Sequence, residues 1–153
     1  MWAHLPSGRH TDRSRSLLVI QRAERSRERT GLGSWAVREQ ESGRMAGTAG
    51  VDRSEAGVWN LGYRFHPDFQ GRGLASAVAR LAIALAQQTA PSLPVVARML
   101  DTNPSSVRLA ERAGLRHLWH GSAAAADGSA RERHVFADRE LDADALAAVI
   151  ALG

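Results

Sequence analysis

Apolar and polar positions follow two periods along the chain, which predicts a mixture of helices and strands. Short apolar or alternating runs bounded by glycine or polar turns predict six strands, at residues 34–39, 45–51, 58–65, 95–100, 116–122 and 131–136. Helical spacing and capping residues predict helices over residues 13–29, from 74 onward, from 104 to a cap at 114, and over 141–152. In the second of these helices we expect one buried stripe, made of Leu74, Ala77, Val78, Leu81 and Leu85.

The boundaries of these segments define an order that indicates the fold class. Thr11 or Asp12 can cap the first helix, and Asp127-Gly128 predicts a hairpin turn between the last two strands. The order is helix, three antiparallel strands, helix, strand, helix, two strands and a final helix. It predicts an α+β fold with a mixed, mostly antiparallel sheet flanked by helices. A length of 153 residues suits one domain, residues 1–153, with its own core.

Residues 63–76 form the most informative stretch, with a strand end, a proline break, a glycine-spaced loop and a helix start. Gly71 and Gly73 let the backbone turn sharply and let a ligand approach without meeting a Cβ. The free amides and positive dipole end of the following helix are suited to a phosphate or pyrophosphate. Arg72 adds a positive charge in the same loop.

Two common phosphate-binding loops do not fit this stretch. The Walker loop needs a lysine after its second glycine, and the chain contains no lysine. The dinucleotide fingerprint needs three glycines in a βαβ unit, whereas this loop has two and follows predicted hairpins. The order Gln70-x-x-Gly73-x-Ala75 instead resembles the coenzyme A pyrophosphate loop of the GNAT superfamily of N-acetyltransferases.

A second segment follows the predicted strand at 95–100. Asn103 suits a helix N-cap, Pro104 the first helical position and Gly114 the C-terminal cap. The spacing Asn103-x-x-Ser106-x-x-Leu109-x-x-x-x-Gly114 also resembles the pattern that GNAT enzymes carry after their fifth strand. With both patterns present in the family's order, the chain resembles this family over about residues 32–136.

Within the family, residues 59–65 and the spacing from residue 114 to 128 resemble the ribosomal-protein-alanine N-acetyltransferase type. GNAT domains normally begin with an extra strand and helix, for which this chain leaves little room, so we expect a shortened N-terminus. An uncovered sheet edge would invite pairing with a second copy, and a homodimer is therefore expected.

The resemblance implies acetyl-CoA as donor and an amine as acceptor, with direct transfer between them. Backbone amides of residues 70–75 would bind the pyrophosphate, and the strand edge at 61–65 would pair with the pantetheine arm and offer an oxyanion donor. Ser106 could offer its hydroxyl to the leaving thiolate, or make a local backbone bond instead. The residues expected at the cofactor are Tyr63, Arg64, Phe65, Gln70, Gly71, Arg72, Gly73, Leu74, Ala75, Asn103 and Ser106.

The catalytic groups are less clearly indicated than the cofactor loop. Many family members place an acid tyrosine seven residues after the asparagine, a position that here holds Ala110. Tyr63 is expected in the core or the pocket wall. An α-amine is roughly a tenth neutral at pH 7, so it needs less help from a base than a lysine side chain. The candidates for that base are Glu55, Glu132, His120 and His134.

Composition leaves two alternatives open. The first is a non-catalytic CoA-binding module of the same fold, because the acid tyrosine is absent. The second is an arginine-rich nucleic-acid-binding domain, suggested by the net charge of +4 and the 20 basic residues, all arginine. Glu24 and Glu28 interleave with the arginines of the first helix, which is typical of a solvated face.

The lack of cysteine excludes disulfides, thiolate metal sites and cysteine nucleophiles, and no metal ion is expected. The N-terminal residues do not resemble a signal peptide, since residues 17–20 are the one short apolar run and arginines flank it. No apolar run approaches membrane-spanning length. These features predict a cytoplasmic protein that acts without a membrane.

Overall fold

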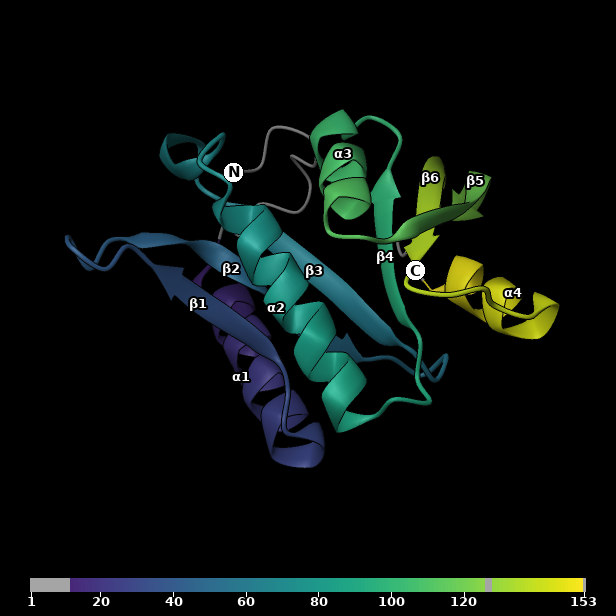
Figure 1. Cartoon of the computed structure of the whole chain (residues 1–153), viewed down its shortest axis with the longest axis horizontal. Coiled ribbons are helices and arrows are strands. Elements are labelled where there is room, and N and C mark those ends of the chain that lie inside the picture. The colour runs from purple at the N-terminus through teal and green to yellow at the C-terminus, as the bar shows by residue number, and fades with distance from the viewer. Residues whose placement is uncertain (1–11, 126–127, 153) are drawn as a thin grey trace.

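A computed structural model describes residues 12–125 and 128–152, and its elements follow the predicted order (Figure 1). The helices are α1 (Arg13–Thr30), α2 (Leu74–Thr89), α3 (Pro104–Arg112) and α4 (Ala143–Ala151), with a short 3-10 helix at Pro67–Phe69. The strands are β1 (Ser34–Arg38), β2 (Met45–Arg53), β3 (Trp59–Phe65), β4 (Val95–Leu100), β5 (Arg116–Ala124) and β6 (Ala130–Ala137). Asp12 caps α1 through a side-chain bond to an amide. Thr11 and Asp127 lie outside the described residues.

The six described strands form one sheet in the order β1-β2-β3-β4-β6-β5. All neighbours are antiparallel except β3 and β4, which confirms the predicted α+β class with a mostly antiparallel sheet. The parallel pairing of β3 with β4 covers only Trp59 with Val95 and Asn60 with Val96. Beyond these pairs the two strands separate. From residue 61 onward, β3 therefore has no described pairing with β4.

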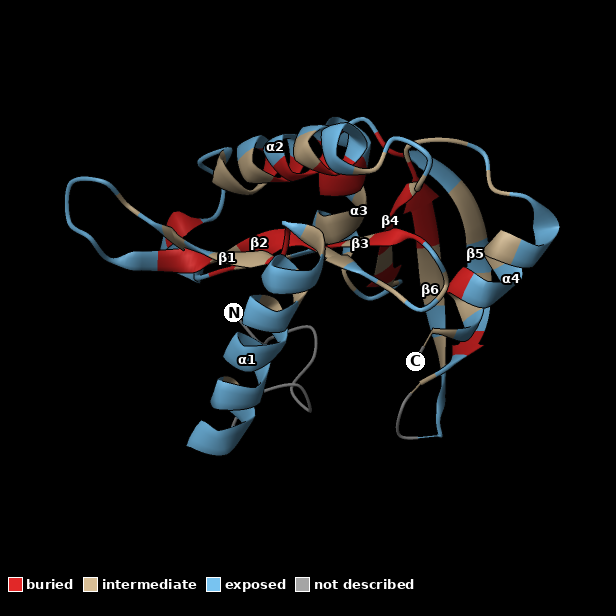
Figure 2. Ribbon diagram, turned by 90° about the horizontal axis from the view of Figure 1, so that it is seen from below, coloured by how far each residue is buried: buried red, intermediate tan, exposed pale blue. Residues whose placement is uncertain are grey.

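Helices cover both faces of the sheet (Figures 1 and 2). Figure 2 shows α2 above and α1 below the part of the sheet built from β1, β2 and β3. Alternate residues of β4 face two different clusters: Val95 and Ala97 pack under α2 and α3, whereas Val96 packs with Val149 of α4. The helix α4 thus covers the face opposite to α3.

The buried stripe of α2 differs from the predicted one. Leu81 is 54% exposed, and the buried positions are Ser76, Ala79, Ala82, Ile83 and Ala86. Because most of these side chains are small, the helix can approach β2 and β3 closely, and the larger leucines lie toward the edges of the contact. The prediction of a helix here was right. Of the predicted stripe, Leu74, Val78 and Leu85 pack half-buried against the core, whereas Ala77 and Leu81 are exposed.

The helix α1 has no buried residue, and Leu17, Leu18, Val19 and Ile20 are each about half exposed. In Figure 2 its exposed N-terminal turns project away from the sheet. None of the described helices is long and apolar enough to cross a membrane.

Candidate active site

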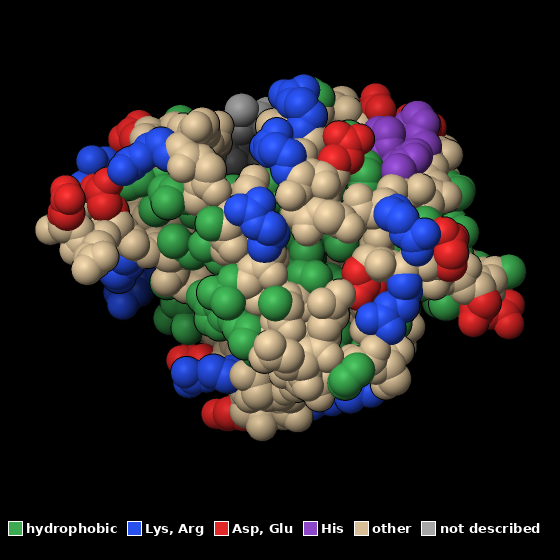
Figure 3. All heavy atoms as spheres, viewed as in Figure 1, with side chains coloured by type: hydrophobic (Ala, Val, Ile, Leu, Met, Phe, Trp, Pro, Cys, Tyr) green, Lys and Arg blue, Asp and Glu red, His purple; other side chains and the backbone are tan. Residues whose placement is uncertain are grey.

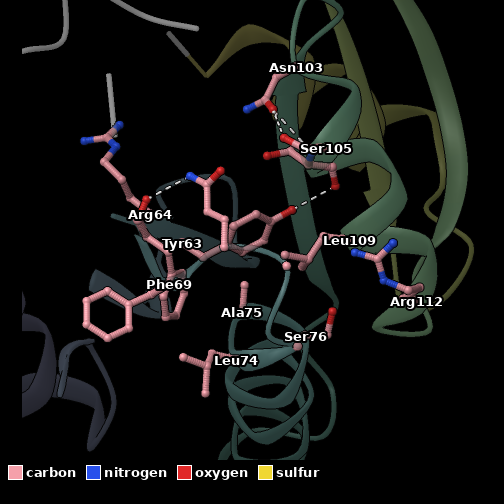
Figure 4. A pocket seen from close by; sticks show the side chains of 15 residues that line it. Tyr63, Arg64, Phe69, Leu74, Ala75, Ser76, Asn103, Ser105, Leu109 and Arg112 are labelled. Carbon is pink, nitrogen blue, oxygen red and sulfur yellow. Dashed lines mark hydrogen bonds between the residues drawn. The ribbon is translucent and has the colours of Figure 1, made fainter. Parts of the chain in front are cut away.

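A cavity of about 470 Å³ opens between the end of β3, the start of α2 and the helix α3 (Figure 4). Its volume falls in the range of small-molecule and cofactor pockets. It lies beside the point where β3 and β4 separate. The residues that line it are Tyr63, Arg64, Phe65, Phe69, Gln70, Gly71, Gly73, Leu74, Ala75, Ser76, Asn103, Ser105, Ser106, Leu109 and Arg112.

The loop before α2 is shaped by a side-chain brace and two left-handed glycines. The side-chain amide of Gln70 donates to the carbonyl oxygen of Phe65 at 3.1 Å and holds the loop against the end of β3. Gly71 and Gly73 have φ values of 75° and 77°, which other residues rarely adopt. A Cβ placed on either glycine would meet no atom within 4 Å. The space beside both glycines is therefore open to a ligand.

The first turn of α2 has backbone amides without acceptors. Gly73 is its N-cap and supplies no side-chain hydrogen bond. The amides of Leu74, Ala75 and Ser76 have no partner within the helix, as in the first turn of any α-helix. The positive end of the helix dipole adds to these donors, so this turn can bind an anion such as a phosphate.

The start of α3 forms the facing wall of the cavity. The side-chain oxygen of Asn103 accepts from the Ser106 amide at 3.3 Å and from the Ser105 hydroxyl at 2.7 Å. With Pro104 at the first position, this N-cap fixes where the helix begins, as predicted. The hydrogen bonds that Ser106 makes with described residues use its backbone, and its side chain lines the cavity.

Tyr63 connects the two walls. Its hydroxyl donates to the carbonyl oxygen of Ser106 at 3.0 Å. Burial raises the pKa of the Tyr63 phenol to about 12, against the smaller effects of this hydrogen bond and of the Arg112 charge, which both lower it. The phenol thus stays protonated through the neutral pH range. The position of the family's acid tyrosine, Ala110, is fully buried.

Arg72 and Glu55, two of the predicted site residues, do not line the cavity. The Arg72 guanidinium points to the hairpin between β1 and β2, where it donates to Glu39 at 2.9 Å and lies over the ring of Phe69. Glu55 lies in the turn before β3, at the opposite end of that seven-residue strand from the cavity. The strand length separates it from Phe65 by roughly 20 Å.

The other three predicted base candidates lie together. His120 on β5 and His134 on β6 both contact Asp101, at 3.4 and 3.1 Å, and Glu132 lies 3.7 Å from His120. None of these residues lines the cavity, although Asp101 is only two residues before Asn103.

Several lining residues were not predicted from the sequence: Phe69, Ser76, Ser105, Leu109 and Arg112. Two of them follow from helix geometry. Positions three apart share a helix face, so Ser106, Leu109 and Arg112 form one row on α3. Arg112 brings a positive charge to the cavity at a position that this row could have indicated.

The chain is similar to known acetyltransferases. Residues 1–116 match the acetyltransferase (GNAT) domain family. A Bordetella pertussis protein assigned to the GNAT-family acetyltransferases is 23% identical with a TM-score of 0.69, over 88% of this chain and 86% of that one. A Salmonella typhimurium protein assigned as an acetyltransferase, solved with its cofactor acetyl-CoA, is 19% identical. Its TM-score is 0.66, over 89% of this chain and 79% of that one.

A third structure is relevant to the predicted subtype. The ribosomal-protein-S5-alanine acetyltransferase from Vibrio fischeri is 14% identical with a TM-score of 0.67, over 82% of this chain and 70% of that one. At such identities, these three structures establish a common fold.

Proposed function

The chain belongs to the GNAT family of acetyltransferases, and on that premise we propose that it transfers an acetyl group from acetyl-CoA to a primary amine. The observation that carries the proposal is the open helix start of α2 beside two left-handed glycines. Phosphate oxygens can reach the amides there because no Cβ fills the space. A cavity lined by both polar and apolar groups continues from this point toward α3.

The residues present suit the parts of the cofactor. The amides at the start of α2 would bind its pyrophosphate, and Arg112 would add a positive charge at the facing wall. The β4-facing edge of β3 at residues 61–65, beyond the last described β3–β4 pair, would bind the amides of the pantetheine arm by strand-like hydrogen bonds. When bound, acetyl-CoA supplies a thioester that an amine can attack. An amide of the same edge would polarise the thioester carbonyl.

The leaving group of this reaction needs little acid catalysis from the site. A thiol has a pKa near 8.5, so a thiolate can leave with little help. The Ser106 side chain lines the cavity and would donate a hydrogen bond to the leaving thiolate. The Tyr63 hydroxyl already donates to the Ser106 carbonyl, so Tyr63 would line the cavity and hold α3 against β3.

We infer that the acceptor presents an α-amine or another amine of low pKa. None of the base candidates lines the cavity, so the acceptor nitrogen must lose its proton with little assistance. An α-amine is roughly a tenth neutral at pH 7, whereas a lysine side chain is several hundredfold less so. A peptide N-terminus, as in the ribosomal-protein-alanine type, or a small amine meets this requirement.

A non-catalytic CoA-binding module is the second candidate, because Ala110 stands at the position of the family's acid. An assay for free thiol released from acetyl-CoA distinguishes an acetyltransferase from a binding module. It is run with a panel of peptides and small amines. Amine-dependent thiol release supports the enzyme, with peptide α-amines faster than lysine side chains in peptides with acetylated N-termini. Binding of acetyl-CoA without thiol release in any mixture would favour the module.

A further inference from the structure

Three histidines and two carboxylates gather where β5 and β6 meet the end of β4, in the histidine patch visible in Figure 3. His117 and His120 come from β5, and His134 and Glu132 come from β6. Asp101 is the first residue after β4. None of the five lines the cavity described above.

The sheet backbone fixes the positions of these side chains. His120 and His134 are paired directly across β5 and β6, and their rings stack with centroids 4.2 Å apart and planes 10° from parallel. The amide of Asp101 donates to the carbonyl of Glu132 at 3.0 Å, which ties the end of β4 to β6. Glu132 is two residues before His134 and projects on the same face of its strand.

The ligand atoms of Asp101, His120 and His134 all lie within 4.8 Å of one another. One carboxylate oxygen of Asp101 is 3.1 Å from Nε2 of His134 and 3.4 Å from Nε2 of His120. Tetrahedral zinc with bonds of 2.0–2.1 Å places neighbouring ligand atoms about 3.3 Å apart. The two contacts to Asp101 have about this spacing, whereas the stacked rings of His120 and His134 must turn so that both Nε2 lone pairs point to one ion.

We propose that Asp101, His120 and His134 bind one Zn²⁺ ion, with Glu132 or water in the fourth position. Two imidazoles and a carboxylate suit zinc and similar transition metals, whereas Mg²⁺ and Ca²⁺ prefer oxygen ligands alone. A Glu132 oxygen is 3.7 Å from Nε2 of His120, so a small side-chain movement brings it into the coordination sphere. The Asp101 and His120 side chains are 52% and 45% exposed, which gives the ion a path from solvent.

His117 supplies the outer partner that metal-binding histidines usually have. Its Nε2 lies 3.0 Å from Nδ1 of His134. When Nε2 of His134 binds the ion, its Nδ1 carries the proton and donates a hydrogen bond to Nε2 of His117. Such an outer hydrogen bond fixes the tautomer and orientation of the ligating ring.

An ion at this position would connect β4, β5 and β6 and hold the loop that leads to Asn103, two residues after Asp101. It would also take His120 and His134 away from any role as a proton acceptor. The zinc site does not depend on the proposed acetyl transfer, because it uses other residues and its test requires no activity.

The test is a competitive Zn²⁺ titration of the metal-free 153-residue chain against a chromophoric zinc indicator, with Mg²⁺ as a second titrant. The wild type should take up one Zn²⁺ per chain and no Mg²⁺. His120→Ala and Asp101→Asn should each weaken zinc binding at least about tenfold, because each removes a direct ligand. His66→Ala is the matched control, since His66 also faces a carboxylate, that of Asp68 at 3.5 Å, but lies on another element.

Thermal unfolding with and without Zn²⁺ gives an independent readout. Zinc should raise the melting temperature of the wild type and of His66→Ala, and should raise that of Asp101→Asn clearly less at the same zinc concentration. Asp101 is exposed, so this variant keeps its fold, which circular dichroism checks. The proposal is overturned if the wild type fails to compete with the indicator. It is equally overturned if zinc binding is unchanged in both ligand variants.

Discussion

The hydroxyl of Tyr63 donates a hydrogen bond to the backbone carbonyl of Ser106 at 3.0 Å, which joins the end of β3 to the first turn of α3. The two residues are 43 positions apart in the chain and come from opposite walls of the cavity. The side chain of Tyr63 thus spans the region where β3 and β4 have separated. The width of the cavity is set partly by this one contact.

Tyr63→Phe should test whether this tyrosine is a tether or an acid. Loss of the hydrogen bond should lower the free energy of unfolding by about 1 kcal/mol, because one part-buried bond is removed. The KM for acetyl-CoA should rise a few-fold as α3 loosens, with kcat largely kept. Urea unfolding and steady-state kinetics measure both effects. A fall in kcat of a hundredfold or more at unchanged KM would instead identify Tyr63 as the acid.

Gly73→Leu should abolish tight binding of acetyl-CoA, because its side chain would occupy the space beside the first-turn amides of α2. Gly57→Leu is the matched control. Gly57 has a similar φ of 71°, also has open space around it, and lies in the turn between β2 and β3. Each substitution should cost at least about 1–2 kcal/mol of stability for its left-handed backbone. Calorimetry should show an affinity loss of at least about tenfold for Gly73→Leu alone.

Arg112→Gln should weaken acetyl-CoA binding several-fold at low salt and less at high salt, because salt screens an exposed charge. Arg108 lies on the same helix and is also exposed, but it does not line the cavity, so Arg108→Gln should leave the affinity unchanged. Titrations at two ionic strengths make the comparison. Equal effects of the two substitutions would show that Arg112 acts only through the overall charge of the protein.

Asp138 should contribute stability that depends on pH. Burial acts to raise its pKa, but hydrogen bonds from Arg139, Gln87 and the Val95 amide outweigh it, so the pKa lies below its ordinary value of 3.8. The stabilisation is therefore full above that value and is lost as the pH falls through the lower, folded-state pKa.

Asp138→Asn should accordingly lower the free energy of unfolding by about 1–3 kcal/mol at neutral pH, with the difference shrinking under acid conditions. Urea unfolding from pH 7 down to pH 2 measures it. Glu140→Gln is the control, since Glu140 forms a surface pair with Arg116 and is 77% exposed. A difference that stays constant down to pH 2 would contradict the assigned role of the carboxylate.

The order of elements could be predicted from the sequence because local signals mark nearly every boundary. Asn103, Pro104 and Gly114 determine where α3 begins and ends, and the glycines at 71 and 73 set the loop before α2. These residues act through their own backbone geometry or through neighbours a few positions away. Such effects are contained in a short window of sequence.

Features that depend on distant partners could not be predicted in this way. Arg72 turns from the loop to Glu39, which is 33 residues away, and the residues next to Arg72 in the sequence do not indicate this pairing. The buried face of α2 was only partly predicted because alanines occur around much of that helix, so hydrophobic spacing alone did not favour the face that packs closely on the sheet. The separation of β3 from β4 and the meeting of Asp101 with His134 are likewise products of the sheet as a whole.

The most direct measurement of the central claim is a crystal structure of the protein with bound acetyl-CoA. The account predicts the diphosphate against the amides of Leu74, Ala75 and Ser76, beside Gly71 and Gly73, with the pantetheine arm along the edge of β3 at residues 61–65. A structure in which acetyl-CoA binds at another surface, and the space beside these glycines is empty, would contradict it.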